Sequence, residues 1–289
     1  MKLVYQPLLL LLSVVVLSCE KPAIPDGVVT GKHGNLVVNI ATVEQMPFPG
    51  FSTRATVVEA CSRLNFLVYD SLGTRVAYEN QTSDKDGFGS AAFQLSPGKY
   101  QLVVVGSSGK SNPTTTNPAK IQFTKSTGFT DTFYSNDYVV VGDSLVSANV
   151  SLARNVALCR VMFTDTIPQD VSKLQFEYKG GSGSFDASTG LGVSTKSSQV
   201  ATFAAEAGRD STVYDLYTFL PADADSVHLK AEAYASDDKL IRSREFNVPM
   251  ARRQITKFSG AFFSGSSGST ITVIIGIDTS WEGEVEVEF

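Results

Sequence analysis

Residues 61–73 read CSRLNFLVYDSLG, and this stretch indicates the type of fold. Between its charged ends, the segment Arg63–Asp70 is apolar except for one asparagine, as is typical of a β-strand. Alternate side chains of this strand share one face: Leu64, Phe66 and Val68. Gly73 ends a short turn, and residues 74–79 continue as a second strand. The stretch therefore predicts a β-hairpin.

Segments of the same kind lie on both sides of this hairpin, and short stretches rich in Gly, Pro, Asp and Ser separate them. No segment has the apolar spacing and the end signals of a sustained helix. Short strands at this spacing predict an all-β sandwich protein. We expect further strands at residues 35–43, 88–95, 99–105, 121–123, 144–152, 171–178, 200–204, 212–220, 226–235, 240–248, 255–263, 270–277 and 284–289.

A second block of strands opens near Val156. Its residues 160–163 (RVMF) echo residues 63–66 (RLNF), and each motif lies close to a cysteine. Such an echo fits two tandem copies of one sandwich. We place the boundary near residue 153, with an N-terminal β-sandwich at 35–153 and a C-terminal β-sandwich at 154–289.

The first twenty residues, MKLVYQPLLLLLSVVVLSCE, predict export. Lys2 supplies a positive charge, and the apolar run Leu8–Leu17 has the length of a signal-peptide core but is too short to span a bilayer. The run ends at Ser18-Cys19, which resembles the lipobox of bacterial lipoproteins. We therefore expect a signal peptide at 1–18, acylation (palmitate) at Cys19 and a flexible tether at 19–34. The alternative is a plain secretory leader with a chance cysteine.

The composition limits the partners. The chain has 289 residues, with 24 Lys and Arg against 29 Asp and Glu and a net charge of −5. There is no basic excess, so nucleic acid is not an expected partner. A hydrophobic fraction of 43%, with 18 Phe and 10 Tyr, is enough for a packed core and favours strands. We expect contact with the membrane only through lipid on Cys19.

Two cysteines remain after Cys19, namely Cys61 and Cys159. In an oxidising compartment they could form a disulfide. Alternatively, both are small buried apolar side chains, which we favour because they are far apart in the sequence.

No group of residues predicts catalysis, a cofactor or a metal site. The histidines are His33, in the tether, and His228, at a surface position of a strand, and no G-x-S-x-G motif or C-x-x-C motif is present. Residues 106–111 (GSSGKS) resemble a phosphate loop but have too few residues between the glycines. Residues 84–87 (DKDG) are best explained as a turn.

Two features point instead to strand pairing. The C-terminus, residues 281–289 (WEGEVEVEF), alternates Glu with apolar residues to the end. Such a strand either closes its own sheet, which we favour, or adds to the sheet of another subunit with Val285, Val287 and Phe289 as its contacts. Arg54, followed by Ala55, lies in a polar segment after the first predicted strand. It is a possible protease cleavage site, although an incidental loop arginine is the simpler interpretation.

Together these features resemble the fimbrillin-A-associated anchor proteins, which are minor-fimbrium anchor and accessory lipoproteins of Bacteroides-type bacteria. The resemblance covers nearly the whole chain and rests on structural motifs in a fixed order. Besides the leader, these motifs are GNLVV at 34–38, CSRLNFLVYDSLG at 61–73, RNVA at 154–157, RQITKFSG at 253–260, and Trp281.

The resemblance implies two tandem Greek-key, transthyretin-like β-sandwiches. It also implies a lipid-anchored protein of the outer membrane or cell surface that joins fimbrillin and accessory fimbrial proteins by β-strand exchange. Stalk and tip subunits of the wider superfamily are cut after an Arg that follows their first strand, and Arg54 is the matching position. We expect a non-enzymatic fimbrial anchor or accessory subunit. The alternatives are a surface glycan- or host-binding lipoprotein and a processed tip or stalk subunit.

Overall fold

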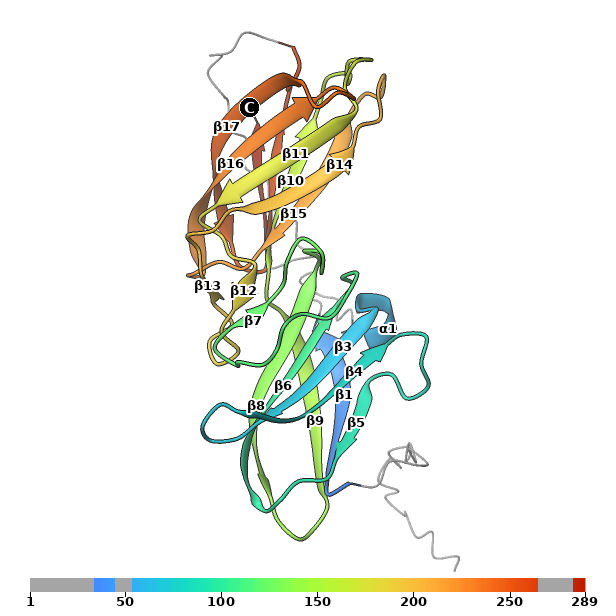
Figure 1. The fold of residues 1–289 in the computed structure, drawn as a ribbon, viewed down its shortest axis with the longest axis vertical. Coiled ribbons are helices and arrows are strands. Elements are labelled where there is room, and N and C mark those ends of the chain that lie inside the picture. The colour runs from blue at the N-terminus through green and yellow to red at the C-terminus, as the bar shows by residue number, and fades with distance from the viewer. Residues whose placement is uncertain (1–33, 45–53, 265–282, 289) are drawn as a thin grey trace, which may run out of the picture. The chain divides into compact units, whose positions relative to one another are not determined.

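The computed structural model describes residues 34–44, 54–264 and 283–288. These residues form an all-β fold with one helix of four residues, α1 (Val57–Ala60) (Figure 1). The predicted all-β sandwich class is confirmed. The predicted signal peptide, most of the tether and the predicted strand at 270–277 lie outside the described residues.

The N-terminal strands form one extended sheet that folds over its own core. Its order is β2-β1-β9-β8-β6-β3-β4, and β5 pairs with β1. The link between its two layers, β8 to β9, consists of only two residue pairs, so the layers can face each other. The strands are β1 (Leu36–Glu44), β2 (Arg54–Ala55), β3 (Arg63–Tyr69), β4 (Arg75–Thr82), β5 (Ser90–Phe93), β6 (Gly98–Ser107), β8 (Thr132–Val141) and β9 (Val146–Arg154).

The C-terminal strands form two sheets of four strands each. One has the order β15-β10-β18-β19 and the other the order β14-β11-β16-β17. Their facing side chains make a core rich in aromatic residues, in which Phe163 stacks on Phe262 at 4.3 Å between ring centroids. The strands are β10 (Ala157–Phe163), β11 (Lys173–Lys179), β14 (Gln199–Ala204), β15 (Thr212–Thr218), β16 (Ala224–Tyr234), β17 (Leu240–Ala251), β18 (Gln254–Gly260) and β19 (Gly283–Glu288).

The two sets of strands have the same connectivity. β1 pairs antiparallel with β5 and parallel with β9, and β10 pairs antiparallel with β15 and parallel with β18. In the other layer, the order β4-β3-β6-β8 matches the order β14-β11-β16-β17. The chain therefore contains one strand arrangement twice. That residues 35–153 and 154–289 fold as separate domains stays a prediction.

The sequence echo that suggested this repeat is wrong in its detail. The motif at 160–163 lies in β10, whose counterpart in the first set is β1, whereas the motif at 63–66 begins β3. The repeat is one of pairing order, and four matching residues do not mark its equivalent strands.

A small fourth sheet joins the two sets of strands. Its order is β13 (Gly192–Val193), β12 (Ser184–Phe185) and β7 (Ile121–Gln122). Side chains of β7 and β12 belong to a third core, distinct from the cores of the two sets of strands, that also contains Leu67, Tyr69 and Val103 from the outer face of β3 and β6. β3 and β6 are consequently buried on both faces, which explains their continuous apolar runs.

Most strands lie where the sequence predicts them, with small shifts at the ends. The predicted inward face of β3 is confirmed, because Leu64, Phe66 and Val68 are fully buried in the first core. β8, which the sequence analysis did not predict, is the largest omission. Its centre carries Asn136 and Asp137, which are residue types that strands disfavour, and it is held by ten residue pairs with β6.

Candidate functional site

The residues predicted to matter for attachment do not form one site. Cys19 and Phe289 lie outside the described residues. Arg54 and Ala55 form β2, which pairs with the end of β1. Val285 and Val287 belong to β19, where only the path of the backbone is described. The structure therefore places two of these elements, β2 and β19, in different sheets.

β1 is an inner strand of its sheet. It makes four residue pairs with β5 on one side and eight with β9 on the other. Leu36, Val38 and Val43 have no exposed surface and contribute to the first core. A strand with this much buried surface closes the sandwich, and its removal would open a groove along β5 and β9.

β19 lies at the end of its sheet. It pairs in parallel with β18, from Gln254–Gly283 to Ser259–Glu288. Among the described residues, no other strand pairs with it, so its second side has no strand partner there.

The motifs that resemble nucleotide and metal sites have structural roles. The Arg63 side chain donates from Nε to the carbonyl oxygen of Gly109 and from Nη2 to that of Lys110, both at 2.9 Å. A phosphate would need backbone amides, and the amide of Lys110 already donates to the carbonyl oxygen of Thr127 at 2.6 Å. Residues 84–87 lie in two successive turns, in which the Lys85 amide donates to the carbonyl oxygen of Thr82 and the Ser90 amide to that of Gly87. Within the described residues, there is no group of three or more potential metal ligands among His, Cys, Asp and Glu.

His228 occupies the predicted surface position. Its side chain is exposed and lies 3.4 Å from a carboxylate oxygen of Glu245. The described residues include no helix of the length and hydropathy needed to cross a bilayer.

Cys61 and Cys159 are both buried and unpaired. Burial raises the pKa of the Cys61 thiol to about 12, and nearby Asp131 adds to this shift while Arg154 opposes it. Burial also raises the pKa of Cys159. Both thiols therefore stay protonated at neutral pH, which agrees with the interpretation as small apolar core residues.

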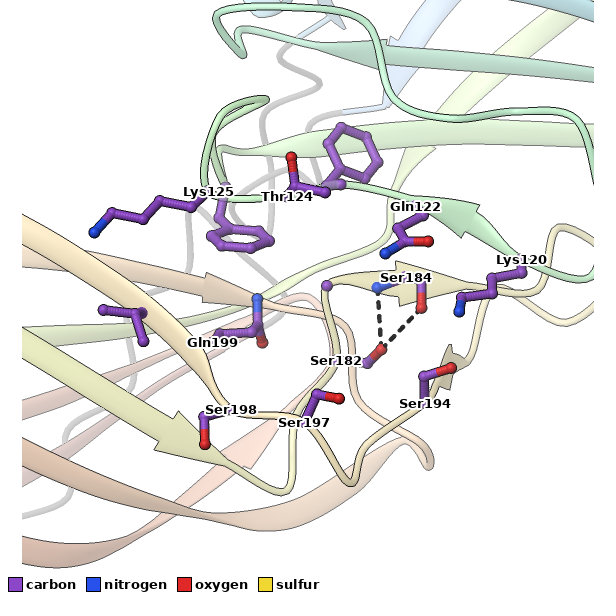
Figure 2. A pocket seen from close by; sticks show the side chains of 14 residues that line it. Lys120, Gln122, Thr124, Lys125, Ser182, Ser184, Ser194, Ser197, Ser198 and Gln199 are labelled. Carbon is purple, nitrogen blue, oxygen red and sulfur yellow. Dashed lines mark hydrogen bonds between the residues drawn. The ribbon is translucent and has the colours of Figure 1, made fainter.

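One cavity lies beside the small sheet of β13, β12 and β7 (Figure 2). It has a volume of about 330 Å³ and is lined by β7, by the segment after it, by β12 and by the residues before β14. A second cavity of about 210 Å³ shares Lys125, Phe129 and Val200 with it. The two cavities together form a polar depression, which we call the double cavity.

Serine hydroxyls line the floor of the larger cavity. Ser182 Oγ accepts from the backbone amide of Ser184 at 3.0 Å, and Ser184 Oγ donates to the carbonyl oxygen of Val193 at 2.9 Å. Figure 2 shows Ser194, Ser197 and Ser198 on one side of the cavity, opposite Gln122 and Lys120. Ser194 has a left-handed backbone with φ of 64°, which is unusual for a residue other than glycine.

One buried amide at this site has an unsatisfied donor. Gln199 is 4% exposed, and its Oε1 accepts from the hydroxyl of Thr218. Its Nε2 has no hydrogen-bond partner among the described residues. An unpaired buried amide is costly in free energy, so this nitrogen favours an acceptor in the cavity.

The double cavity cannot be predicted from the sequence. Residues 180–192 are a Gly- and Ser-rich segment between two predicted strands, and nothing in the spacing of residues indicates that this segment lies beside residues 120–129. The available signal was the polar, hydroxyl-rich composition of the loop.

Comparisons with known proteins give one family and several similar folds. The model of the family described as "Family of unknown function (DUF6562)" matches residues 111–289. No curated protein matches the sequence.

Similar solved structures come from Porphyromonas, Parabacteroides and Bacteroides species. One is the fimbrial anchor protein Mfa2 of Porphyromonas gingivalis, with a TM-score of 0.42 and 12% identity over 72% of this chain and 80% of that one. A fimbrial assembly protein of Parabacteroides distasonis has a TM-score of 0.40 and 14% identity over 88% and 97%. A candidate adhesin of Bacteroides thetaiotaomicron has a TM-score of 0.44 and 16% identity over 72% and 79%.

Proposed function

This chain belongs to the family of unknown function DUF6562, and from that premise we propose that it is a surface lipoprotein which anchors or caps a fimbrium. In this proposal, acyl chains on Cys19 hold it at the outer membrane, and it joins fimbrillin by pairing of β-strands. It acts without catalysis. Its strands form two tandem sandwiches, at residues 35–153 and 154–289.

The observation that carries the proposal is the position of β19. The last strand of the chain lies at the end of its sheet and is paired on one side only among the described residues. An edge strand of this kind can receive a strand from another subunit, with main-chain hydrogen bonds supplying affinity. The leader supports the other half of the proposal, because its apolar run ends at Ser18-Cys19.

In an anchor, β1 stays in place. Its buried side chains complete the first core, so the sandwich needs no strand from outside. Cleavage after Arg54 would instead suit a processed stalk or tip subunit. The N-terminus of the protein in its native membrane separates these two roles.

Mass spectrometry after crosslinking in the native membrane tests the proposal. We expect an acylated N-terminus at Cys19 and crosslinks between fimbrillin and residues 283–288. A chain that begins at Ala55 without lipid would contradict the anchor role and support a processed subunit. An acylated chain without fimbrillin crosslinks would contradict the fimbrial role.

A pair of proline variants tests strand pairing itself. Successive backbone amides of a strand point to opposite sides, so of V285P and E286P one removes a donor toward β18 and the other a donor toward the open side. We expect the variant on the open side to lose fimbrillin capture while its thermal stability stays close to that of the parent. The threonine variants V285T and E286T keep the backbone donors and serve as controls. Equal fimbrillin capture by all four variants would contradict pairing through β19.

A further inference from the structure

The double cavity has no part in the proposed strand pairing, and its chemistry indicates a ligand. Lys120 and Lys125 line the larger cavity, and Lys110 and Lys125 line the smaller one. The Lys125 amine lies 3.3 Å from the hydroxyl of Thr202. Three ammonium groups around one depression create a local positive field in a chain with a net charge of −5.

Carboxylates do not cancel this field. Among the residues that the structure describes, no Asp or Glu lines the larger cavity. Asp215 lines the smaller one, but its two oxygens accept from Nε and Nη2 of Arg160 at 2.8 and 3.0 Å. Its charge is therefore already paired, and the lysines favour an anion from outside.

The remaining groups suit a ligand rich in hydroxyls. The larger cavity carries serine hydroxyls, the carboxamide of Gln122 and the unpaired Nε2 of Gln199. The half-buried ring of Phe129 borders both cavities, and Tyr217 borders the smaller one. Amides and hydroxyls around an apolar ring fix the orientation of a small polar ligand. The larger volume alone reaches the lower end of the range of about 300–1,000 Å³ for such sites.

We propose that the double cavity binds an acidic saccharide, which is a sugar unit carrying a carboxylate or a sulfate. The lysines hold the anionic group, Gln199 Nε2 donates to a ring hydroxyl or to the anionic group, and Phe129 packs against the C–H face of the sugar. Figure 2 shows Gln199 between the segment that carries Thr124 and Lys125 on one side and Ser197 and Ser198 on the other. This binding is independent of attachment to fimbrillin.

Isothermal titration of the full-length chain in detergent tests the proposal, with three probes. A galacturonic acid trimer carries carboxylates, a heparin-derived disaccharide carries sulfates, and a galactose trimer is neutral. We expect binding of at least one acidic probe, weakened by added salt, and binding at least about tenfold weaker for the neutral trimer. Preference between the two acidic probes identifies the anionic group.

Variants locate the site. We expect K120Q combined with K125Q to weaken binding of the acidic probe by about tenfold or more, and S198Y to block it by filling the cavity. K85Q is the matched control, because Lys85 lies in an exposed turn outside both cavities and its loss should leave binding unchanged. Circular dichroism checks that each variant is folded.

Three outcomes would overturn the proposal. These are no detectable binding of either acidic probe, equal binding of the neutral and acidic trimers, and unchanged binding in the lysine pair and S198Y. A failure to capture fimbrillin would contradict the proposed function but not this proposal, because the double cavity has no part in strand pairing.

Discussion

Gly106 shows how closely a single residue is constrained in the first core. It lies in β6, and a methyl group added to it would come within 2.6 Å of the Cys61 sulfur. The side chains of Leu152 and Leu64 would be 3.2 and 3.3 Å away. A glycine is needed here because neighbouring side chains fill the space above the strand, a reason independent of backbone flexibility.

We expect G106A to destabilise the protein by about 1–3 kcal/mol, the usual cost of overpacking. Adding C61A removes the sulfur that the new methyl group meets. The double variant should then be less destabilised than the sum of the single variants, as measured by urea denaturation. G142A is the matched control, since nothing lies within 4 Å of its added methyl group. Strict additivity of G106A and C61A would show that the sulfur is not the obstacle.

Asp165 ties the segment after β18 to the second core. Its carboxylate accepts from the backbone amides of Phe262, Phe263 and Ser264 at 2.8, 2.7 and 2.6 Å. Partial burial raises the pKa of this carboxyl, but the three amides and the Ser264 hydroxyl together outweigh burial and lower it. The folded pKa is thus below the unfolded pKa.

Because the folded pKa of Asp165 is below its unfolded pKa, the protein gains stability from this carboxylate as the pH rises. The contribution of Asp165 to the free energy of unfolding is fully present above its unfolded pKa of about 3.9, and it is lost as the pH falls through the folded pKa. We expect D165N to cost about 1 kcal/mol at pH 7, because solvent partly screens the site, and the difference from the parent should shrink below about pH 4. Urea denaturation midpoints of D165N and of the parent, taken between pH 3 and 7, measure this difference in stability. D143N, at an exposed turn, is the control. A difference that is constant with pH would contradict this role of the charge.

At the scale of elements, periodicity predicts strands well where it is regular and poorly where long-range pairing decides. In the strand predicted at 226–235, Val227, Leu229, Ala231 and Ala233 alternate along β16, and all four lie in the second core. β8 was missed because its polar centre conceals it and its partner β6 is distant in the sequence. The double cavity was missed for a related reason, because residues 120–129 and 182–200 meet only in three dimensions.

The same buried pairing makes a prediction for β1. After a single tryptic cut at Arg54, we expect the N-terminal fragment to remain attached during gel filtration, because β1 pairs on both sides and buries Leu36, Val38 and Val43. The fragment should separate only in denaturant, as followed by mass spectrometry of the eluted peak. R54Q removes the cut and is the control. Release of the fragment in plain buffer would contradict an integral role of β1.

At the scale of the whole molecule, the core beside β7 and β12 determines whether the two sandwiches are independent. Leu67, Tyr69, Val103 and Val105 point outward from the first sandwich and are nevertheless fully buried. Phe185, Phe219 and Ile255 from the later strands share this core. The sequence predicts two tandem units, but only the structure shows that they have buried surface in common.

We therefore expect residues 35–153, expressed alone, to be less soluble than the full chain and to bind a hydrophobic dye, since isolation exposes this apolar surface. Replacing Leu67 and Val103 with threonine in the fragment should reduce dye binding. The comparison uses fluorescence and light scattering against the full-length protein. A fragment that is monomeric, does not bind the dye and melts at the temperature of the full chain would contradict this view and support independent domains.

The parallel pairing of first and last strands has a mechanical consequence. In each set of strands, β1 beside β9 and β10 beside β18, the chain enters at one end of the pair and leaves at the opposite end. A tension pulling on a lipid-held end and on a distant partner would slide these strands along each other. The ladder of hydrogen bonds between them would then resist together in shear, whereas a peeling force breaks such bonds one at a time. Such an arrangement suits a protein that holds a filament against flow.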